Sequence, residues 1–296
     1  MGLLLLLGNT GTAFSGALDN LGTGLESAWS VGRRLRKAYT GPIIRVRRSS
    51  DNTEQDFGYL VNGAVDVAAV ESFCGEDDGE LTTIYDQSGL SRNLIQPTSA
   101  LQPNVVSSGV ANTKNGKLAA LFNTGPHMYV NASQSFYNCL HNGTSSTVCS
   151  VQEVLDTAAE KPLFSTNVGS APGARVTFSG TENVTVNVNT IGSSVVTAAK
   201  TSPTFTYNAM TVLLDANNPV AADRESVWVD DSATELTPNN TVTFGPTTNN
   251  AFSEMYVGYI SAPFTGSICE LIIWSQDISA NRAVWQSTAK TFWGTP

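Results

Sequence analysis

The sequence predicts an all-β fold, a two-sheet antiparallel β-sandwich, and three observations lead to that prediction. Short apolar segments recur through the second half of the chain, and each ends at Gly, Pro, Asn or Asp residues. Valine alternates with Asn or Thr from Asn183 to Asn189, as in a strand with one buried and one wet face. Hydrophobic residues make up 41% of the 296 residues, enough for a sizeable core, whereas only 14% are charged. Segments of this spacing, with almost no helix between them, are typical of sheets packed face to face.

The individual strands follow from period-two alternation or from short β-branched runs. The predicted strands are 43–48, 81–85, 148–154, 175–178, 183–189, 204–215, 226–229, 254–260 and 267–274.

Two short helices are predicted within and after this β-rich region. Residues 65–73 group Val and Ala with Phe73, and residues 279–293 form a closing helix. Ser279 is a suitable N-cap, and Val284 and Trp285 give the closing helix an apolar side.

The N-terminal region, residues 1–37, is predicted to be an extended arm with a short helix, whereas residues 38–296 form one sandwich domain. Leu25, Trp29 and Leu35 fit a partly amphipathic helix over 25–39. Leu3, Leu4, Leu5, Leu6 and Leu7 lack the flanking features of a signal peptide and form too short a run to span a bilayer. We expect these leucines to anchor the protein to a partner.

The charge balance argues against a nucleic-acid partner. The net charge is −9 and the isoelectric point is about 4.7, whereas phosphate binding needs a basic surface. Seven of the sixteen basic residues nevertheless gather in one segment, and they form either a set of ion pairs or a docking patch for an acidic protein. These residues are Arg33, Arg34, Arg36, Lys37, Arg45, Arg47 and Arg48.

The cysteines and histidines do not predict a metal site. The four cysteines, Cys74, Cys139, Cys149 and Cys269, include no CxxC pair, and the chain has only two histidines. A Cys139–Cys149 disulfide and free buried thiols are both compatible with the sequence. Calcium is compatible with a fold of this class, but no DxDxDG loop supports it, and the sequence predicts no cofactor.

Two parts of the chain resemble known families. Glycoside hydrolase family 54, the fungal arabinofuranosidases, has a similar series of blocks at the start of its catalytic domain. Those blocks are Ala38–Pro42, Val46–Asp51, Glu71–Cys74 and Thr83–Gly89, of which Tyr85-Asp86-Gln87-Ser88-Gly89 is the most specific. The last block is also similar to one in bacteriophage virion proteins. The segments Phe264–Trp274 and Ser279–Arg282 resemble the closing strand and helix of laminin-G-like modules in phage head and tail proteins. Both resemblances imply a concanavalin A/laminin-G-like jelly roll.

The arabinofuranosidase resemblance also implies where catalytic residues would lie. In that family the acid/base aspartate follows the strand that matches Tyr256–Gly258, but this chain has no carboxylate from Tyr259 to Pro263. Glu182 is the nearest candidate for the nucleophile. The position of a second family cysteine is Gly79 here. A retaining glycosidase needs two carboxyl groups about 5–5.5 Å apart, so these departures predict that the chain is not an enzyme.

Three residues are candidates for ligand binding, each with an alternative structural role. Asp86 either caps the turn before Gly89 through backbone N–H groups or binds a sugar or a metal. Trp228, with Asp230 beside it, either stacks on a ligand at a strand end or packs as a half-buried core residue. Trp274, Trp285 and Trp293 are expected to pack in the interior.

The function predicted from these observations is a non-catalytic bacteriophage structural protein, displayed on the virion surface as a head decoration, head fibre or tail-associated subunit. Its expected partners are other virion proteins, capsid or tail subunits, in a homo-oligomer, with a possible host surface polysaccharide and no membrane span. The alternative is a secreted α-L-arabinofuranosidase-like glycoside hydrolase that uses a relocated carboxylate pair, with Glu182 and Asp215 as the residues to test.

Overall fold

The computed structural model describes residues 14–123, 125–156, 158–167, 172–179, 183–188, 193–197, 207–220, 223–230, 233–236, 245–260 and 262–296. Nearly all regular structure is antiparallel β, so the predicted sandwich is confirmed. The strands are β1 (Leu25–Ser30), β2 (Ile44–Arg48), β3 (Glu54–Phe57), β4 (Gly79–Ile84), β5 (Leu94–Ile95), β6 (Asn104–Ser107), β7 (Val110–Ala111), β8 (Thr113–Lys114), β9 (Lys117–Leu118), β10 (Ala120–Phe122), β11 (Met128–Val130), β12 (Ser146–Val154), β13 (Lys161–Ser165), β14 (Ala174–Ser179), β15 (Asn183–Val188), β16 (Ser193–Thr197), β17 (Asn208–Leu214), β18 (Glu225–Val229), β19 (Met255–Val257) and β20 (Gly266–Trp274). The α-helices are α1 (Val67–Cys74) and α2 (Arg282–Trp293), and short 3₁₀ turns span Ser99–Leu101, Asn138–Leu140 and Ser279–Asn281.

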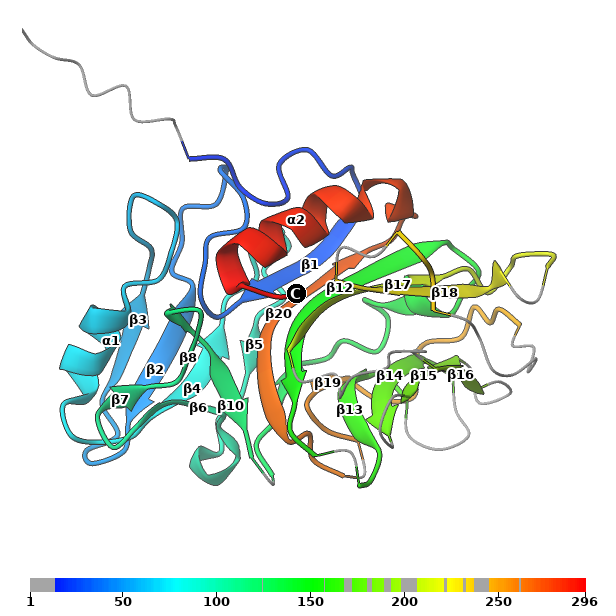
Figure 1. The fold of residues 1–296 in the computed structure, drawn as a ribbon. Coiled ribbons are helices and arrows are strands. Elements are labelled where there is room, and N and C mark those ends of the chain that lie inside the picture. Colours follow the sequence, from blue (N-terminus) through cyan, green and yellow to red (C-terminus); the bar gives the residue numbers. More distant parts are fainter. Residues whose placement is uncertain are drawn as a thin grey trace, which may run out of the picture.

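The strands form two layers (Figure 1). The first sheet has the order β1-β20-β12-β17-β18. The second runs from β3 through β2, β4, β5, β11, β19, β13 and β14 to β15 and β16. Strands β6 and β10 connect β4 to β20, so the two layers form one continuous hydrogen-bonded sheet.

The main core lies between the two sheets. Trp29, Phe164, Val186 and Leu271 are among its buried residues and come from both layers. Successive side chains of a strand point to opposite faces, so the valines of β15 enter this core while Thr185 and Asn187 point outward. The polar side that the alternation predicts for this strand therefore lies on the outward face of the second sheet, but it is not fully wet, because Thr185 is half-buried and Asn187 is buried.

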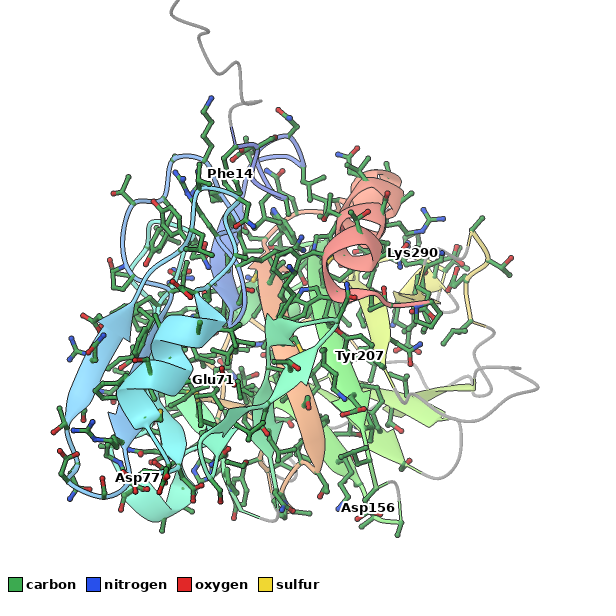
Figure 2. The ribbon with its side chains drawn as sticks, turned by 60° about the vertical axis from the view of Figure 1, so that its left-hand side comes forward. Phe14, Glu71, Asp77, Asp156, Tyr207 and Lys290 are labelled. Atoms are coloured by element: carbon green, nitrogen blue, oxygen red, sulfur yellow. The ribbon has the colours of Figure 1, made fainter. Side chains whose placement is uncertain are left out.

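A second apolar core lies on the other side of the first sheet, under α2 (Figure 1). Trp274, Trp285 and Trp293 are each at most 1% exposed, which confirms that they pack in the interior. Tyr207, labelled in Figure 2, donates a hydrogen bond of 2.9 Å to the Trp293 carbonyl at the end of α2. The helix therefore closes the outward face of the first sheet.

The helix expected over 25–39 is wrong, because residues 25–30 form β1 and pair with β20. Both faces of β1 are buried: Trp29 enters the main core, whereas Ala28 enters the core under α2. Apolar residues on both faces remove the alternation that identifies a half-buried strand, so the segment has a helix-like pattern. The division of the chain at residue 37 stays a prediction.

The two helices predicted elsewhere are present, with corrections to the second. Helix α1 begins after Asp66, whose side chain accepts a hydrogen bond of 3.1 Å from the Ala69 N–H. Ser279 does not cap α2, because a 3₁₀ turn precedes the helix and Asn281 makes no capping side-chain bond. Val284 is 54% exposed, so only Trp285 of the expected pair is buried.

Four arginines of the basic segment make ion pairs rather than a free positive surface. Arg33 contacts Glu270 at 2.7 Å and Arg45 contacts Asp56 at 2.7 Å. Arg47 also pairs with Glu80, and Arg48 with Asp51. None of the helices in the described ranges is long and apolar enough to cross a membrane.

Candidate functional site

A row of polar and aromatic side chains crosses the outward face of the second sheet. Antiparallel partners that lie directly opposite point to the same face. Tyr129 of β11 lies opposite Tyr256 of β19, Tyr256 opposite Ser165 of β13, Ser165 opposite Arg175 of β14, and Arg175 opposite Asn187 of β15. We call these five residues the polar row.

The turn region between β13 and β14 fixes the central part of the polar row. The Thr166 N–H donates to the Ala174 carbonyl at 2.9 Å, and the Ala174 N–H donates to Thr166 Oγ1 at 2.9 Å. Gly173 has φ +138°, and a Cβ there would come 2.8 Å from the Thr166 carbonyl oxygen. Ser165 Oγ donates to the Asn167 carbonyl at 2.5 Å. Ser165 and Arg175 therefore lie on a rigid pair of strands.

Three polar groups in this region have no hydrogen-bond partner although they are buried. They are Arg175 Nε, Asn187 Nδ2 and Asn167 Oδ1. Asn167 is 1% exposed and Asn187 is 8% exposed. An unsatisfied buried polar group costs about 1–3 kcal/mol, so such groups are rare unless a ligand or water completes them. Two donors and one acceptor without partners are well suited to the hydroxyl groups of a polyol.

The positive charge of Arg175 in the polar row is balanced by one carboxylate, that of Glu160. Glu160 Oε1 lies 3.6 Å from Arg175 Nη2 and accepts a hydrogen bond of 3.0 Å from Thr177 Oγ1. Thr177 shares the outward face of β14 with Arg175, two residues away. The guanidinium and the carboxylate offset each other, so the site favours a neutral ligand over an ion.

Tyr256 belongs to the polar row as a neutral phenol. Burial raises its pKa above the ordinary value of 10, and the nearby Glu254 carboxylate acts in the same direction. Its ring centroid lies 5.8 Å from that of Tyr129. The tyrosine end of the row therefore offers ring faces together with hydroxyl groups.

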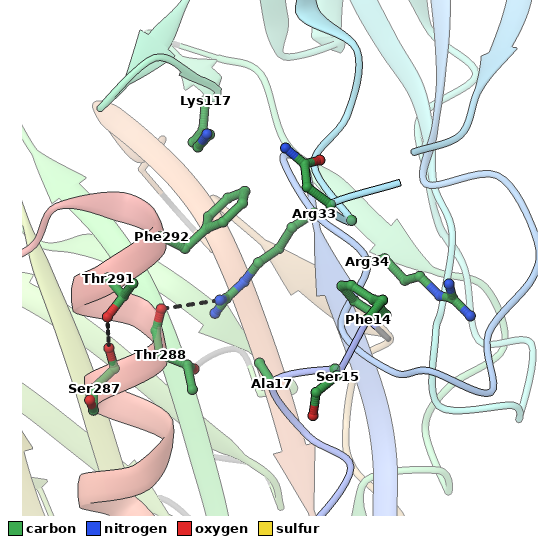
Figure 3. Close-up of a pocket in the computed structure, with 13 residues that line it drawn as sticks. Phe14, Ser15, Ala17, Arg33, Arg34, Lys117, Ser287, Thr288, Thr291 and Phe292 are labelled. Carbon is green, nitrogen blue, oxygen red and sulfur yellow. Dashed lines mark hydrogen bonds between the residues drawn. The ribbon is translucent and has the colours of Figure 1, made fainter. Parts of the chain in front are cut away.

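A separate cavity of about 450 Å³ lies between the N-terminal segment and α2 (Figure 3). Arg33, Arg34 and Lys117 line it together with Phe14 and Phe292, and none of its lining residues is acidic. Arg33 is held by Glu270 and by the Thr288 carbonyl at 3.2 Å. Sugar hydrolysis requires carboxyl groups, so the lining of this cavity does not suit that chemistry.

Glu225 and Glu235 form a second group of interacting carboxyls. Burial raises the pKa of Glu225 to about 8, and Glu235 adds to the shift. Glu225 alternates along β18 with Val227 and Val229, which lie in the main core, and it is only 4% exposed. Glu225 therefore points into the space between the two sheets and not to the outward face that bears the polar row, so we do not assign it a role in the site.

Asp86 lies in the turn after β4 and makes several hydrogen bonds. Its carboxylate accepts from the backbone N–H groups of Ala28 at 2.9 Å, Ser88 at 2.9 Å and Arg92 at 3.0 Å, and from Ser88 Oγ at 2.6 Å. Asp86 is 4% exposed. These contacts correspond to the turn-capping role weighed for this residue and connect the turn to β1.

Trp228 and Asp230 lie at the end of β18 and point to different environments. Trp228 is 8% exposed, and the Arg282 guanidinium lies 4.7 Å from its ring centroid. Asp230 has φ +58° and accepts hydrogen bonds from Asn208 Nδ2 at 2.8 Å and the Ala209 N–H at 3.2 Å. The structure does not bring either residue to the polar row.

The remaining sequence candidates are placed as follows. Leu3 to Leu7 and Glu182 lie outside the described residues. Asp215 follows β17 in the first sheet and accepts a bond of 3.3 Å from Asn218 Nδ2. All four cysteines are free and buried, so Cys139 and Cys149 form no disulfide. The described residues contain no group of three or more His, Cys, Asp or Glu side chains arranged for a metal ion.

Sequence reasoning missed Ser165, Arg175 and Glu160. The available signal was the alternation itself: Arg175 is a single charged residue between Ala174 and Val176, so its side chain faces away from the core. The strand partners of that arginine, Ser165 and Asn187, are 10 and 12 residues away, but Ser165 also lies opposite Tyr256, about ninety residues along the chain, which the local pattern does not identify.

The comparisons with known proteins agree with this architecture. Residues 18–148 match the family model described as alpha-L-arabinofuranosidase B, catalytic. A probable alpha-L-arabinofuranosidase B of Aspergillus flavus is 39% identical over 108 residues, which is 33% of this chain and 21% of the relative. An alpha-L-arabinofuranosidase of Hypocrea jecorina is 36% identical over 107 residues, again 33% of this chain and 21% of the relative. The chain thus spans about a fifth of these relatives.

Solved structures resemble almost the whole chain in fold. An arabinofuranosidase complexed with arabinofuranosyl-alpha-1,2-xylobiose has a TM-score of 0.57 and 15% identity, covering 90% of this chain and 62% of that one. A GH54 arabinofuranosidase soaked with a cyclic sulfate inhibitor has a TM-score of 0.53 and 15% identity, covering 88% of this chain and 62% of that one. The sandwich therefore resembles the arabinofuranosidase catalytic fold.

These matches overturn the prediction of a bacteriophage virion protein. The family model and the named relatives are arabinofuranosidases, so the non-catalytic structural role, the assignment as a non-enzyme and the virion-surface location are wrong. The prediction rested on three observations: the leucines at 3–7, the phage-like closing segment, and the turn after β19, where the sequence has no carboxylate. The absence of an acid at one turn does not exclude acids from other segments, and the fold brings Glu160 to the polar row.

Proposed function

We propose that this chain is the carbohydrate-active sandwich of an arabinofuranosidase-like glycoside hydrolase, with its sugar site on the polar row. The observation that carries the proposal is the match of residues 18–148 to the arabinofuranosidase catalytic model, extended by a similar fold over 90% of the chain. We further propose that the protein is secreted, because the substrates of such an enzyme are glycans outside the cell.

The chemistry of the polar row supports a neutral sugar as its ligand. Arg175 Nε and Asn187 Nδ2 are donors without partners, and Asn167 Oδ1 is an acceptor without a partner. Sugar hydroxyls both donate and accept, so one furanose ring can satisfy groups of both kinds. A site that binds hydroxyls in this way discriminates strongly against analogues that lack them, because its buried polar groups would otherwise stay unpaired.

Hydrolysis of a glycoside requires two carboxyl groups. One protonates the leaving oxygen as its bond to the anomeric carbon breaks, and the other attacks that carbon or activates a water molecule. Glu160 contacts the polar row through Arg175 and Thr177, so we assign it one of these two roles. Arg175 is the positioning residue that fixes the Glu160 carboxylate.

The test is turnover of 4-nitrophenyl α-L-arabinofuranoside and of arabinofuranosyl-α-1,2-xylobiose by the purified chain. We expect both to be hydrolysed, and Glu160→Gln to lower kcat/KM by about 100-fold or more, the typical contribution of a positioned acid or base. Glu182→Gln, the substitution suggested by the sequence, is measured in parallel.

Glu153→Gln is the matched control. Glu153 is also an ion-paired carboxylate, 2.5 Å from Lys114 Nζ, but it lies on β12 of the first sheet. We expect its kcat/KM to equal that of the parent protein. A folded protein that releases no sugar from either substrate contradicts the proposed hydrolase activity.

A further inference from the structure

Four aromatic rings gather beside the polar row, at β11 and β19. His127 stacks on Tyr259 with 4.8 Å between ring centroids and 26° between ring planes. Tyr256 lies 5.8 Å from His127, 5.8 Å from Tyr129 and 6.3 Å from Tyr259. Each of the four rings therefore lies next to at least one other ring of the group. We call His127, Tyr129, Tyr256 and Tyr259 the aromatic platform.

The aromatic platform stays partly exposed although its rings are large. All four side chains are of intermediate exposure, whereas the neighbouring core residues Met128, Met255 and Val257 are at most 1% exposed. Clustered rings on a soluble protein surface are typical of a binding site, because water disfavours contiguous apolar surface. The platform is therefore not explained by core packing.

The backbone around the aromatic platform holds the rings in place. Pro126 precedes His127, and His127 Nδ1 lies 3.1 Å from the Gly125 carbonyl oxygen. Gly258 has φ +81°, a conformation that favours glycine, and it ends β19 so that Tyr259 turns toward His127. Tyr259 also makes a bridge to Pro263. Little conformational entropy is therefore lost when a ligand covers the rings.

The aromatic platform and the polar row form one surface. Tyr256 belongs to both, and it lies directly opposite Ser165, which lies opposite Arg175. Adjacent strands are about 4.8 Å apart, so Arg175 lies roughly 10 Å from Tyr256, comparable to the length of a disaccharide. A glycan whose terminal sugar occupies the row at Arg175 would continue across the tyrosines.

We infer that the aromatic platform binds the part of a neutral oligosaccharide that adjoins the sugar held by the polar row. This inference rests on the proposed function and assigns the residues that would hold the sugars next to the furanose. The C–H face of a sugar packs on an aromatic ring while its hydroxyls reach the phenol oxygens at the ring edges, the amphipathic contact that tyrosine favours. None of the four side chains carries the negative charge of an acid, so the platform suits an uncharged chain.

The test measures binding by titration calorimetry with two ligands, arabinofuranosyl-α-1,2-xylobiose and methyl α-L-arabinofuranoside, and the Glu160→Gln protein serves as the parent for all binding variants so that turnover is slow during the titration. The short ligand carries no aromatic aglycone, so it cannot stack on the rings in place of a sugar. For Tyr259→Ala we expect Kd for the trisaccharide to rise on the order of 5- to 10-fold, which corresponds to the free energy of one aromatic stacking contact. We expect Kd for the methyl glycoside to stay unchanged.

Tyr85→Ala is the control, because Tyr85 is a partly exposed tyrosine on the same sheet that donates to Asp56 and lies outside the aromatic platform. We expect it to leave both Kd values unchanged. Equal trisaccharide affinity in Tyr259→Ala and in the parent overturns the inference, as does the absence of saturable trisaccharide binding to the parent. Binding to this parent without hydrolysis by the unsubstituted chain contradicts the proposed hydrolase activity and leaves the platform supported, so the two failures are distinguishable.

Discussion

The two outward faces of the sandwich have opposite chemistry although the strands beneath them belong to one hydrogen-bonded sheet. On the first sheet, α2 covers the outward face and creates a second apolar core, which includes Trp274, Trp285 and Trp293. On the second sheet, the outward face carries the polar row and the aromatic platform. The first face is covered by a helix and packed with apolar side chains, whereas the second carries polar side chains, of which Ser165 and Asn187 are buried and Tyr129, Tyr256 and Arg175 are partly exposed.

The difference is clearest when the burial and hydrogen bonding of one charged pair on each face are compared. Glu270 is fully buried and accepts from Arg33 at 2.7 Å and from Trp293 Nε1 at 2.5 Å. Glu160 is 38% exposed and lies 3.6 Å from Arg175, whose Nε has no partner. The Glu270 pair is therefore satisfied within the protein, whereas the Glu160 pair leaves the Arg175 Nε donor without a partner.

The largest effect on stability is expected for Glu270→Gln on the covered face. The substitution leaves the Arg33 guanidinium buried without a negative partner, and breaking a buried ion pair costs about 3–5 kcal/mol. We expect the free energy of unfolding, measured by chemical denaturation, to fall by about 3 kcal/mol. The control is Glu160→Gln, where the pair is partly exposed and a loss under about 1 kcal/mol is expected. Equal losses in the two variants would remove the distinction between the faces.

A pH effect of intermediate size is expected from Glu225, a buried carboxyl between the two sheets. Burial raises its pKa from 4.5 to about 8, so the folded state holds this proton more tightly than the unfolded state does. Its stabilising contribution is therefore complete below pH 4.5 and is lost as pH rises toward 8.

Glu225→Gln removes this titration because the amide stays neutral. We expect the variant to exceed the parent in unfolding free energy at pH 8, and the difference to shrink toward pH 4.5. Chemical denaturation at a series of pH values measures it. A difference that does not change with pH would show that Glu225 ionises freely in the folded protein.

The sequence predicted those features that depend on local pattern. The alternation from Asn183 to Asn189 correctly indicated a strand with one apolar side, although Asn187 on the opposite, polar side is buried and not wet. The block around Asp86 correctly indicated a turn, because a short acidic side chain followed by Ser and Gly can bind its own backbone N–H groups. Each inference needed only neighbouring residues.

The sequence did not predict the site, because the site depends on which strands pair. Tyr129, Tyr256, Ser165 and Arg175 come from four separate segments, and only the register of β11, β19, β13 and β14 aligns them. The misassigned helix at β1 has the same cause: its apolar residues face two different cores, and the second core exists only because α2 folds back from the far end of the chain.

The smallest effect is expected from a matched pair of threonine-to-valine substitutions, one on each face. Thr147 on the covered face is fully buried, its Oγ1 donates to the Gln276 carbonyl at 3.0 Å, and it accepts from the Ile278 N–H at 3.0 Å. Valine keeps the shape and β-branching but leaves both backbone groups unpaired, so we expect Thr147→Val to lower the unfolding free energy by about 1–2 kcal/mol. Thr185 lies on the outward face of β15, and we expect Thr185→Val to change it by less than about 0.5 kcal/mol. A larger loss at Thr185 than at Thr147 would mean that the face bearing the polar row is as firmly packed as the face beneath α2, which is not compatible with a surface kept free for a sugar.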